Sequence, residues 1–366
     1  MKAAAQTTPS ASGSTAFESK RAFDFFARPH DEPPRIGSLL KSAPFSGRIV
    51  DLVSHDYSQG RSDYVIAIPV RDEAELLPRC LASLRRAMAA TSTLGTVVVV
   101  VNGSTDESAQ VVVDWLLRHA VAGLVVEVAF DLSIQDAPHA RRLALDIAAQ
   151  FAPDGVLLTT DADSYVGTDW IDRALASIER GFDLVCDDVR LDESEASSLP
   201  KEVGRIGELE RAYVAACIDL WRLWTGTTDD PVDTRASGAG MAIRTSAYTA
   251  VGGLPLPRHG EDRALRSIMR QSGFRTMTSL DCGTRTSARL DARAAGGCGE
   301  TLRQRAVDPD PVCDGSLVPV AQLMAIARGD RSLSGSLPAS SPMRASELRR
   351  QFDIAVALLT EAGLRP

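Results

Sequence analysis

Short apolar runs alternate with segments of helical periodicity over residues 64–189, and this alternation restricts the fold more than any other feature of the chain. The apolar runs, which we expect to be buried strands, lie at residues 64–70, 96–101, 124–130, 156–158 and 182–189. The segments expected to be helices lie at residues 73–89, 107–120, 137–150 and 168–180. This order predicts an α/β fold with a doubly wound, mostly parallel sheet and right-handed crossovers.

The rest of the chain predicts an extension at each end of one main domain. Residues 1–60 are rich in Ala, Ser, Thr and Pro, so we expect a flexible N-terminal arm with at most a short helix at 18–27. We expect the main domain at residues 61–306, with halves at 61–195 and 196–306, and a helical C-terminal extension at 307–366. Further expected elements are a core helix at 202–224, a small, flexible segment at 236–243, a helix at 261–272, a strand at 275–280, and helices at 319–327 and 345–362.

Composition narrows the function. A chain of 366 residues with 44% apolar side chains can bury a substantial core. The net charge of -8, the pI near 5.3 and the lack of a dense Lys/Arg tract argue against a nucleic-acid partner. The six cysteines form no C-x-x-C pair, which argues against a zinc knuckle or a disulfide framework. Because no stretch reaches about 18 apolar residues, we expect a cytoplasmic protein with reduced thiols and no transmembrane segment.

Polar clusters follow three of the expected strands. They are Arg71-Asp72-Glu73, the segment 102–106, and Asp161-Ala162-Asp163. Ligands of open α/β sheets lie beyond the carboxyl ends of the strands, so these clusters should share one crevice. Two carboxylates separated by one small residue repel each other unless a cation is present, and oxygen-only ligands favour Mg²⁺ or Mn²⁺. Helix capping by Ser104 or Thr105 is the alternative explanation of the second cluster.

The motifs in their order resemble the inverting nucleotide-sugar glycosyltransferases of family 2. The matching motifs are residues 68–73 (IPVRDE), 102–106 (NGSTD), Ala140-Arg141, Asp161-Ala162-Asp163, Gly238-Ala239-Gly240 and Gly260-Glu261-Asp262. The resemblance runs from residue 64 to about residue 302, roughly two-thirds of the chain. The resemblance implies a nucleotide-diphospho-sugar transferase (GT-A-like) fold and the transfer of a sugar, of the hexosyl type, to a hydroxyl acceptor whose class the sequence does not name.

The resemblance also implies a role for each matching position. Asp163, with Asp161, would ligate the metal, Mg²⁺ or Mn²⁺, that bridges the two donor phosphates. Asp262, with Glu261 beside it, would be the catalytic base. The donor and its nucleotide would be bound by Pro69, Arg71, Glu73, Asn102, Asp106, Arg141, Asp161, Gly238 and Gly240. The first half of the domain would then bind the nucleoside-diphosphate sugar and the second half the acceptor; peripheral contact with a lipid-linked acceptor is compatible with this.

The chemistry of a single inverting displacement supports this assignment. A carboxylate removes the acceptor hydroxyl's proton, while a metal and cationic side chains stabilise the departing nucleoside diphosphate. A carboxylate at a helix start has a low pKa, so burial must raise its basicity. Helix capping alone is the alternative explanation of the Glu261-Asp262 pair.

Two features depart from the family pattern, and a third segment has two possible explanations. Val101 occupies the position where many relatives have an aspartate that reads the base, so the sequence leaves uracil, guanine and thymine open. No histidine lies between residues 280 and 293, where many relatives complete the metal site; His259 is best explained as an isolated surface residue. The arginine-containing segment 285–297 either closes over phosphates or is a solvated basic loop.

Other functions fit the sequence less well. A haloacid-dehalogenase-type phosphohydrolase would carry Gly-Thr after the second aspartate, where this chain has Ser164-Tyr165. A sugar-phosphate nucleotidylyltransferase would have a Gly-rich loop in place of residues 69–73. A dinucleotide enzyme lacks support because Gly238-x-Gly240 has no third glycine. A nucleotide-sugar-binding scaffold without turnover is the non-enzyme alternative, and hydrolysis of the donor would separate it from an enzyme.

Overall fold

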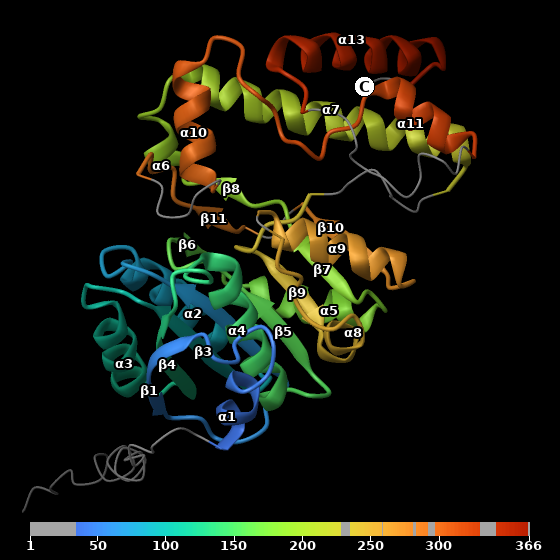
Figure 1. Cartoon of the computed structure of the whole chain (residues 1–366). Helices are drawn as coiled ribbons and strands as arrows, with labels where there is room; N and C mark the ends of the chain where they lie inside the picture. Colours follow the sequence, from blue (N-terminus) through green and yellow to red (C-terminus); the bar gives the residue numbers. More distant parts are fainter. Residues whose placement is uncertain are drawn as a thin grey trace, which may run out of the picture.

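A mixed, mostly parallel sheet forms the centre of the molecule (Figure 1). The computed structural model describes residues 34–227, 235–257, 259–280, 283–291, 297–329 and 342–364. Within them, an eight-stranded sheet has the order β1-β4-β3-β2-β5-β9-β7-β10. Its strands are β1 (Ile49–Asp56), β2 (Tyr64–Val70), β3 (Gly95–Asn102), β4 (Gly123–Phe130), β5 (Val156–Thr159), β7 (Leu184–Asp187), β9 (Met241–Arg244) and β10 (Thr276–Ser279). The pairs β2–β3, β3–β4, β2–β5 and β7–β10 are parallel, which confirms the predicted fold class.

Helices cover both faces of this sheet. Val65 and Ala67 of β2 pack toward one face, and Ile66 and Ile68 pack toward the other. Because both faces are covered, the central strands are apolar along their whole length, as parallel strands usually are. The first face carries α1 (Pro34–Leu40), α4 (Ala137–Phe151), α8 (Thr245–Ala250) and α9 (Glu261–Gln271), and the second carries α2 (Leu77–Ala90), α3 (Ser108–His119) and α5 (Trp170–Glu179).

A smaller sheet and a helical layer lie beyond the large sheet (Figure 1). The small sheet contains β6 (Ser164–Tyr165), β11 (Arg285–Thr286) and β8 (Arg190–Leu191) in that order. The helices of this part are α6 (Glu193–Ala196), α7 (Lys201–Thr225), α10 (Cys298–Val307), α11 (Val320–Ala327) and α13 (Ala345–Glu361). Tyr213 and Leu220 of α7 are buried against α11 and α13, which confirms the predicted core helix. None of the described helices combines the length and apolarity needed to cross a membrane.

Some sequence expectations are wrong. Residues 49–56 lie in the expected flexible arm but form β1, which pairs antiparallel with β4. Residues 241–244, expected to be part of a flexible segment, form β9, which pairs antiparallel with β5 and β7. Helix α10 (Cys298–Val307) is not among the expected elements. The expected helix at 73–89 begins only at Leu77. The short helix expected at residues 18–27 lies outside the described residues.

Candidate functional site

Hydrogen bonds tie together the loops that follow β2 and β3. The backbone N–H of Asp72 donates to Ser104 Oγ at 3.0 Å, and Asp72 Oδ1 accepts from the N–H of Thr105 at 2.7 Å. Asp106 accepts from the N–H of Ala74 at 2.9 Å and from the N–H of Ser108 at 3.0 Å. Asp72 has φ 51°, a left-handed conformation that aspartate tolerates better than most residues. Asp106 therefore fixes the loop after β2 and the start of α3, in addition to any contact with a ligand.

Three predicted nucleotide-binding residues lie beside these loops. Pro69 is half-buried near the end of β2, and Arg71 Nη1 donates to the carbonyl oxygen of Gln135 at 3.2 Å. Asn102 is buried, and its Nδ2 donates to the carbonyl oxygen of Asp136 at 3.2 Å. Among the described residues, none donates a hydrogen bond to Asn102 Oδ1. Asn102 thus has an acceptor without a partner, at the carboxyl end of β3.

Arg141 connects three other predicted site residues. This arginine of α4 is buried, and its Nη1 donates to Asp161 Oδ1 at 2.8 Å and to the carbonyl oxygen of Gly238 at 2.9 Å. Its Nε donates to Glu261 Oε1 at 3.2 Å. Burial acts to lower the pKa of Arg141, but the charges of Asp161 and Glu261 outweigh it and raise that pKa. Residues from α4, from the end of β5 and from the start of α9 therefore meet around one guanidinium.

Gly238 is held against this guanidinium and against Asp262. A Cβ atom added at Gly238 would lie 2.2 Å from Arg141 Cζ, so the close approach requires a glycine. The N–H of Gly238 donates to Asp262 Oδ2 at 3.2 Å, and the N–H of Arg263 donates to Asp262 Oδ1 at 2.7 Å. Burial, and then the charge of Glu261, raise the pKa of Asp262 to about 6. The predicted base therefore lies in the Arg141 cluster with the basicity that such a role needs.

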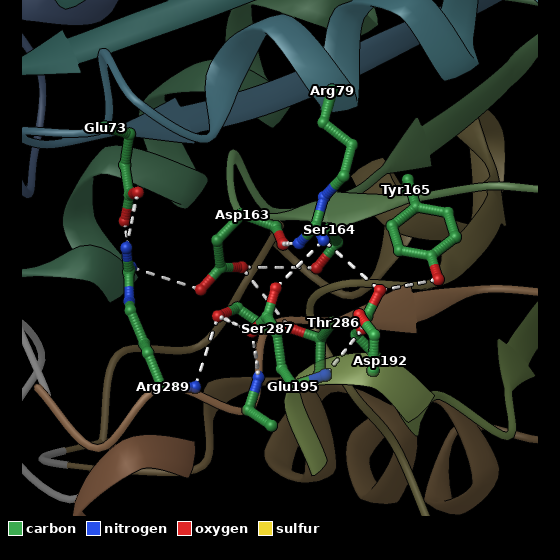
Figure 2. A network of polar contacts seen from close by, with 12 residues as sticks. Glu73, Arg79, Asp163, Ser164, Tyr165, Asp192, Glu195, Thr286, Ser287 and Arg289 are labelled. Carbon is green, nitrogen blue, oxygen red and sulfur yellow. Dashed lines mark hydrogen bonds and ion pairs between the residues drawn. The ribbon is translucent and has the colours of Figure 1, made fainter. Parts of the chain in front are cut away.

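Asp163 lies in a second cluster, which Figure 2 shows from close by. Arg289 Nη2 contacts Asp163 Oδ2 at 3.2 Å, and the same guanidinium binds both carboxylate oxygens of Glu73. The hydroxyl groups of Thr286 and Ser164 each donate to Asp163 Oδ1 at 3.3 Å. Burial and the charge of Asp161 raise the pKa of Asp163 to about 6, while Arg289 opposes this. The neighbouring aspartates Asp161 and Asp163 thus link the two clusters.

The sequence reasoning missed an adjoining group of polar residues. Arg79 of α2 donates to Asp192 at 3.2 Å and to Glu195 at 2.9 Å, and its guanidinium lies 4.9 Å from the centre of the Tyr165 ring (Figure 2). Asp192 also accepts from the N–H of Glu195, a pairing that the D-x-x-E pattern of a helix start would have indicated. A cavity of about 380 Å³ lies beside this group and is lined by Tyr165, Asp192, Glu193, Ser194, Gly283 and Arg285.

Comparison with protein families identifies part of the chain. Residues 65–203 match the model of glycosyl transferase family 2. This segment therefore resembles the glycosyltransferases of family 2. The match covers β2 to β7 of the large sheet and includes Arg141, Asp161 and Asp163, whereas Asp262 and Arg289 lie beyond it. No curated protein matches the chain.

Several solved structures resemble the protein weakly. A mannosyltransferase from Pyrobaculum calidifontis in complex with GDP-Man and Mn²⁺ has 16% identity and a TM-score of 0.47, over 84% of this chain and 79% of that one. Residues 1–349 of S. aureus TarS with UDP-GlcNAc have 15% identity and a TM-score of 0.46, over 82% and 81%. Glucosyl-3-phosphoglycerate synthase from Mycobacterium tuberculosis with Mg²⁺ and UDP has 14% identity and a TM-score of 0.39, over 70% and 82%. At these TM-scores, the three structures contribute nothing to the assignment of activity.

Proposed function

We propose that this protein is a metal-dependent, inverting glycosyltransferase that moves a hexosyl group from a nucleoside-diphosphate sugar to an acceptor hydroxyl. The family match over residues 65–203 supports the reaction class. The observation that carries the finer assignment is the contact of Arg141 with both Asp161 and Glu261, because it brings the end of β5 next to the start of α9. Residues 61–195 are assigned to nucleotide binding and residues 196–306 to acceptor binding, with the loop at 238–240 beneath both donor sugar and acceptor.

The carboxylates near residue 163 have the chemistry of a divalent-cation site. Asp161 and Asp163 offer oxygen ligands only, which suits Mg²⁺ or Mn²⁺. The described residues contain no group of three or more His, Cys, Asp or Glu side chains that could hold a metal. Mg²⁺ usually has one or two protein carboxylates and completes its shell with substrate phosphates and water, so this limited set fits. When bound, the cation neutralises charge that develops on the departing diphosphate.

The remaining site residues are assigned either to binding of the donor or to the catalytic base. Donor binding is assigned to Pro69, Arg71, Glu73, Asn102, Asp106, Arg141, Asp161, Gly238 and Gly240. Asp262 takes the proton from the acceptor hydroxyl, whose oxygen forms a bond to the anomeric carbon from the face opposite the diphosphate. The bond between the anomeric carbon and the diphosphate oxygen breaks, and the nucleoside diphosphate leaves with the electron pair. Glu261 supports Asp262 by raising its pKa.

The family match and the fold disfavour the rival functions. Residues 65–203 match a glycosyltransferase model, which favours this proposal over a phosphohydrolase or a nucleotidylyltransferase. Gly238 and Gly240 precede β9, whereas a dinucleotide-binding glycine motif follows a strand and opens a helix. A binding scaffold would show no donor hydrolysis, so release of free nucleoside diphosphate tests that alternative directly.

Thermal unfolding tests the donor site. A panel of UDP, GDP and dTDP with Mn²⁺ should identify one nucleotide that stabilises the protein, by about 2.7 kcal/mol at a ligand concentration of 100 times Kd. Asp163→Ala should lose the Mn²⁺-dependent part of this stabilisation. Asp154→Ala is the control, because Asp154 is exposed and pairs with Arg61. Retention of the full Mn²⁺-dependent shift by Asp163→Ala would show that the metal binds elsewhere.

The pH dependence of turnover tests the base. Because Asp262 must be ionised to accept a proton and its pKa is raised to about 6, kcat should fall as the pH drops below about 6. Glu261→Gln removes the neighbouring negative charge, so the acid limb should move to lower pH. An acid limb near the ordinary aspartate pKa, unaffected by Glu261→Gln, would exclude Asp262 as the base.

A further inference from the structure

Arg289 lies between two carboxylates of the donor site (Figure 2). Its Nη1 donates to Glu73 Oε2 at 2.8 Å and its Nη2 contacts Glu73 Oε1, so the pair is bidentate. The Nη2 group also contacts Asp163 Oδ2 at 3.2 Å. Asp163 is the residue to which we assign the metal. A guanidinium therefore contacts one oxygen of the proposed metal ligand.

The chain segment that carries Arg289 is anchored. Ser287 Oγ donates to Glu195 Oε2 at 2.6 Å, and the N–H of Ala288 donates to the same oxygen at 2.8 Å. Ser287 and Ala288 are both buried. Two residues before Ser287, Arg285 lies in β11, which pairs with β6, the strand directly after Asp163. These contacts hold the Arg289 backbone close to Asp163, so the guanidinium is not on a solvated basic loop.

The two contacts of Arg289 differ in strength. The contact with Glu73 is bidentate, and Glu73 is buried, whereas the contact with Asp163 uses one nitrogen at 3.2 Å. A divalent cation at Asp163 repels the guanidinium and competes with it for the same carboxylate. The cation can displace Arg289 from Asp163 without breaking the pair with Glu73. The guanidinium would then stay beside the divalent cation. An anion in contact with both would be needed to offset the repulsion between these two positive charges.

We propose that the guanidinium of Arg289 occupies the metal-binding carboxylate of the donor site until a nucleoside diphosphate binds. Metal binding would therefore depend on the nucleoside diphosphate. In the empty protein the guanidinium pairs with Asp163 and keeps the affinity for a free divalent cation low. When a diphosphate arrives with its cation, Arg289 leaves Asp163, remains bound to Glu73 and pairs with a phosphate oxygen. This inference rests on the proposed function, since it assumes a diphosphate donor at Asp163.

Direct measurement of Mn²⁺ binding tests the inference without any turnover. The signal of free Mn²⁺ in electron paramagnetic resonance gives its affinity for the full chain, with and without the nucleoside diphosphate selected by thermal unfolding. Arg289→Ala should bind Mn²⁺ alone about tenfold more tightly than the wild type, because no charged hydrogen bond must first be broken. Adding the nucleotide should raise the Mn²⁺ affinity of both proteins. The factor of this increase should be at least about tenfold smaller for Arg289→Ala than for the wild type.

Three further variants keep the test decisive. Arg244→Ala removes an arginine paired with Asp183, away from the donor site, and should leave Mn²⁺ affinity unchanged. Arg289→Gln keeps most of the side chain without its charge and should repeat the result if Arg289→Ala does not fold. Asp163→Asn added to Arg289→Ala should abolish the gain in affinity.

The outcomes separate this inference from the proposed function. Equal Mn²⁺ affinity of the wild type and both Arg289 variants, in a protein that still transfers sugar, would overturn the inference and leave the function standing. Tighter Mn²⁺ binding by Arg289→Ala that depends on Asp163, in a protein that hydrolyses no donor, would support the inference and overturn the function.

Discussion

Asp262→Asn should lower kcat by about 10²- to 10⁴-fold, the usual contribution of general-base catalysis. Asparagine has the shape of aspartate and can accept the N–H of Gly238, which Asp262 binds at 3.2 Å. It cannot take a proton from the acceptor hydroxyl. Binding of nucleoside diphosphate and Mn²⁺ should change little, because Arg141 and Asp163 remain. Transfer, or donor hydrolysis with water as the acceptor, measures kcat, and calorimetric titration measures binding.

A matched variant separates catalysis from the helix start. Asp169 is likewise an acidic residue at the start of a helix, but it is largely exposed and pairs with Arg173. Asp169→Asn should therefore leave kcat unchanged. Normal turnover by Asp262→Asn would refute the base assignment, and equal losses in both variants would indicate a general effect of altered helix starts.

The sequence predicts the parallel part of the sheet well because those strands are buried on both faces. β2, β3 and β4 consist almost entirely of apolar residues, and their observed bounds differ from the expected ones by at most one residue. β1 gives no such signal, since Val50 and Val53 are exposed on an edge strand that mixes polar and apolar residues. Only its pairing with β4 identifies it, and that pairing is not local.

The sequence does not reveal β9, because this strand is short and follows a glycine-containing turn. Met241 and Ile243 pack into one core and Ala242 into the other, so the strand bridges both faces within four residues. A run of this length has no recognisable period. Its antiparallel pairing with β5 and β7 is not local, so only the tertiary structure defines it.

Ligands of open α/β sheets lie beyond the carboxyl ends of the strands, and this rule predicts which polar clusters share a crevice. It does not predict which charged side chains pair with one another. Asp161 and Asp163 are two residues apart, yet each contacts a different arginine, Arg141 and Arg289. The Arg289–Glu73 pair joins residues 216 positions apart, and the Arg141–Glu261 pair joins residues 120 positions apart. Such pairs depend on how distant segments of the chain pack together, and no local pattern records them.

Arg141→Met should destabilise the protein by about 3–5 kcal/mol, the usual cost of removing one partner from a buried ion pair. Methionine replaces the apolar stem of the side chain but leaves Asp161 and Glu261 without their common cation. The carbonyl oxygen of Gly238 also loses a donor at 2.9 Å. Urea unfolding measures the change, and nucleoside diphosphate binding should weaken in the same variant because the site loses a fixed positive charge.

A second substitution shows whether the unpaired charge causes this loss. Glu261→Gln in the Arg141→Met background removes one uncompensated carboxylate, so it should restore part of the stability even though it deletes a charge. Arg86→Met, on the exposed side of α2, should change stability by no more than about 0.5 kcal/mol. If Arg141→Met costs no more than Arg86→Met, the guanidinium does not hold the two halves of the site together. The proximity of Asp161 to the start of α9 would then need another cause.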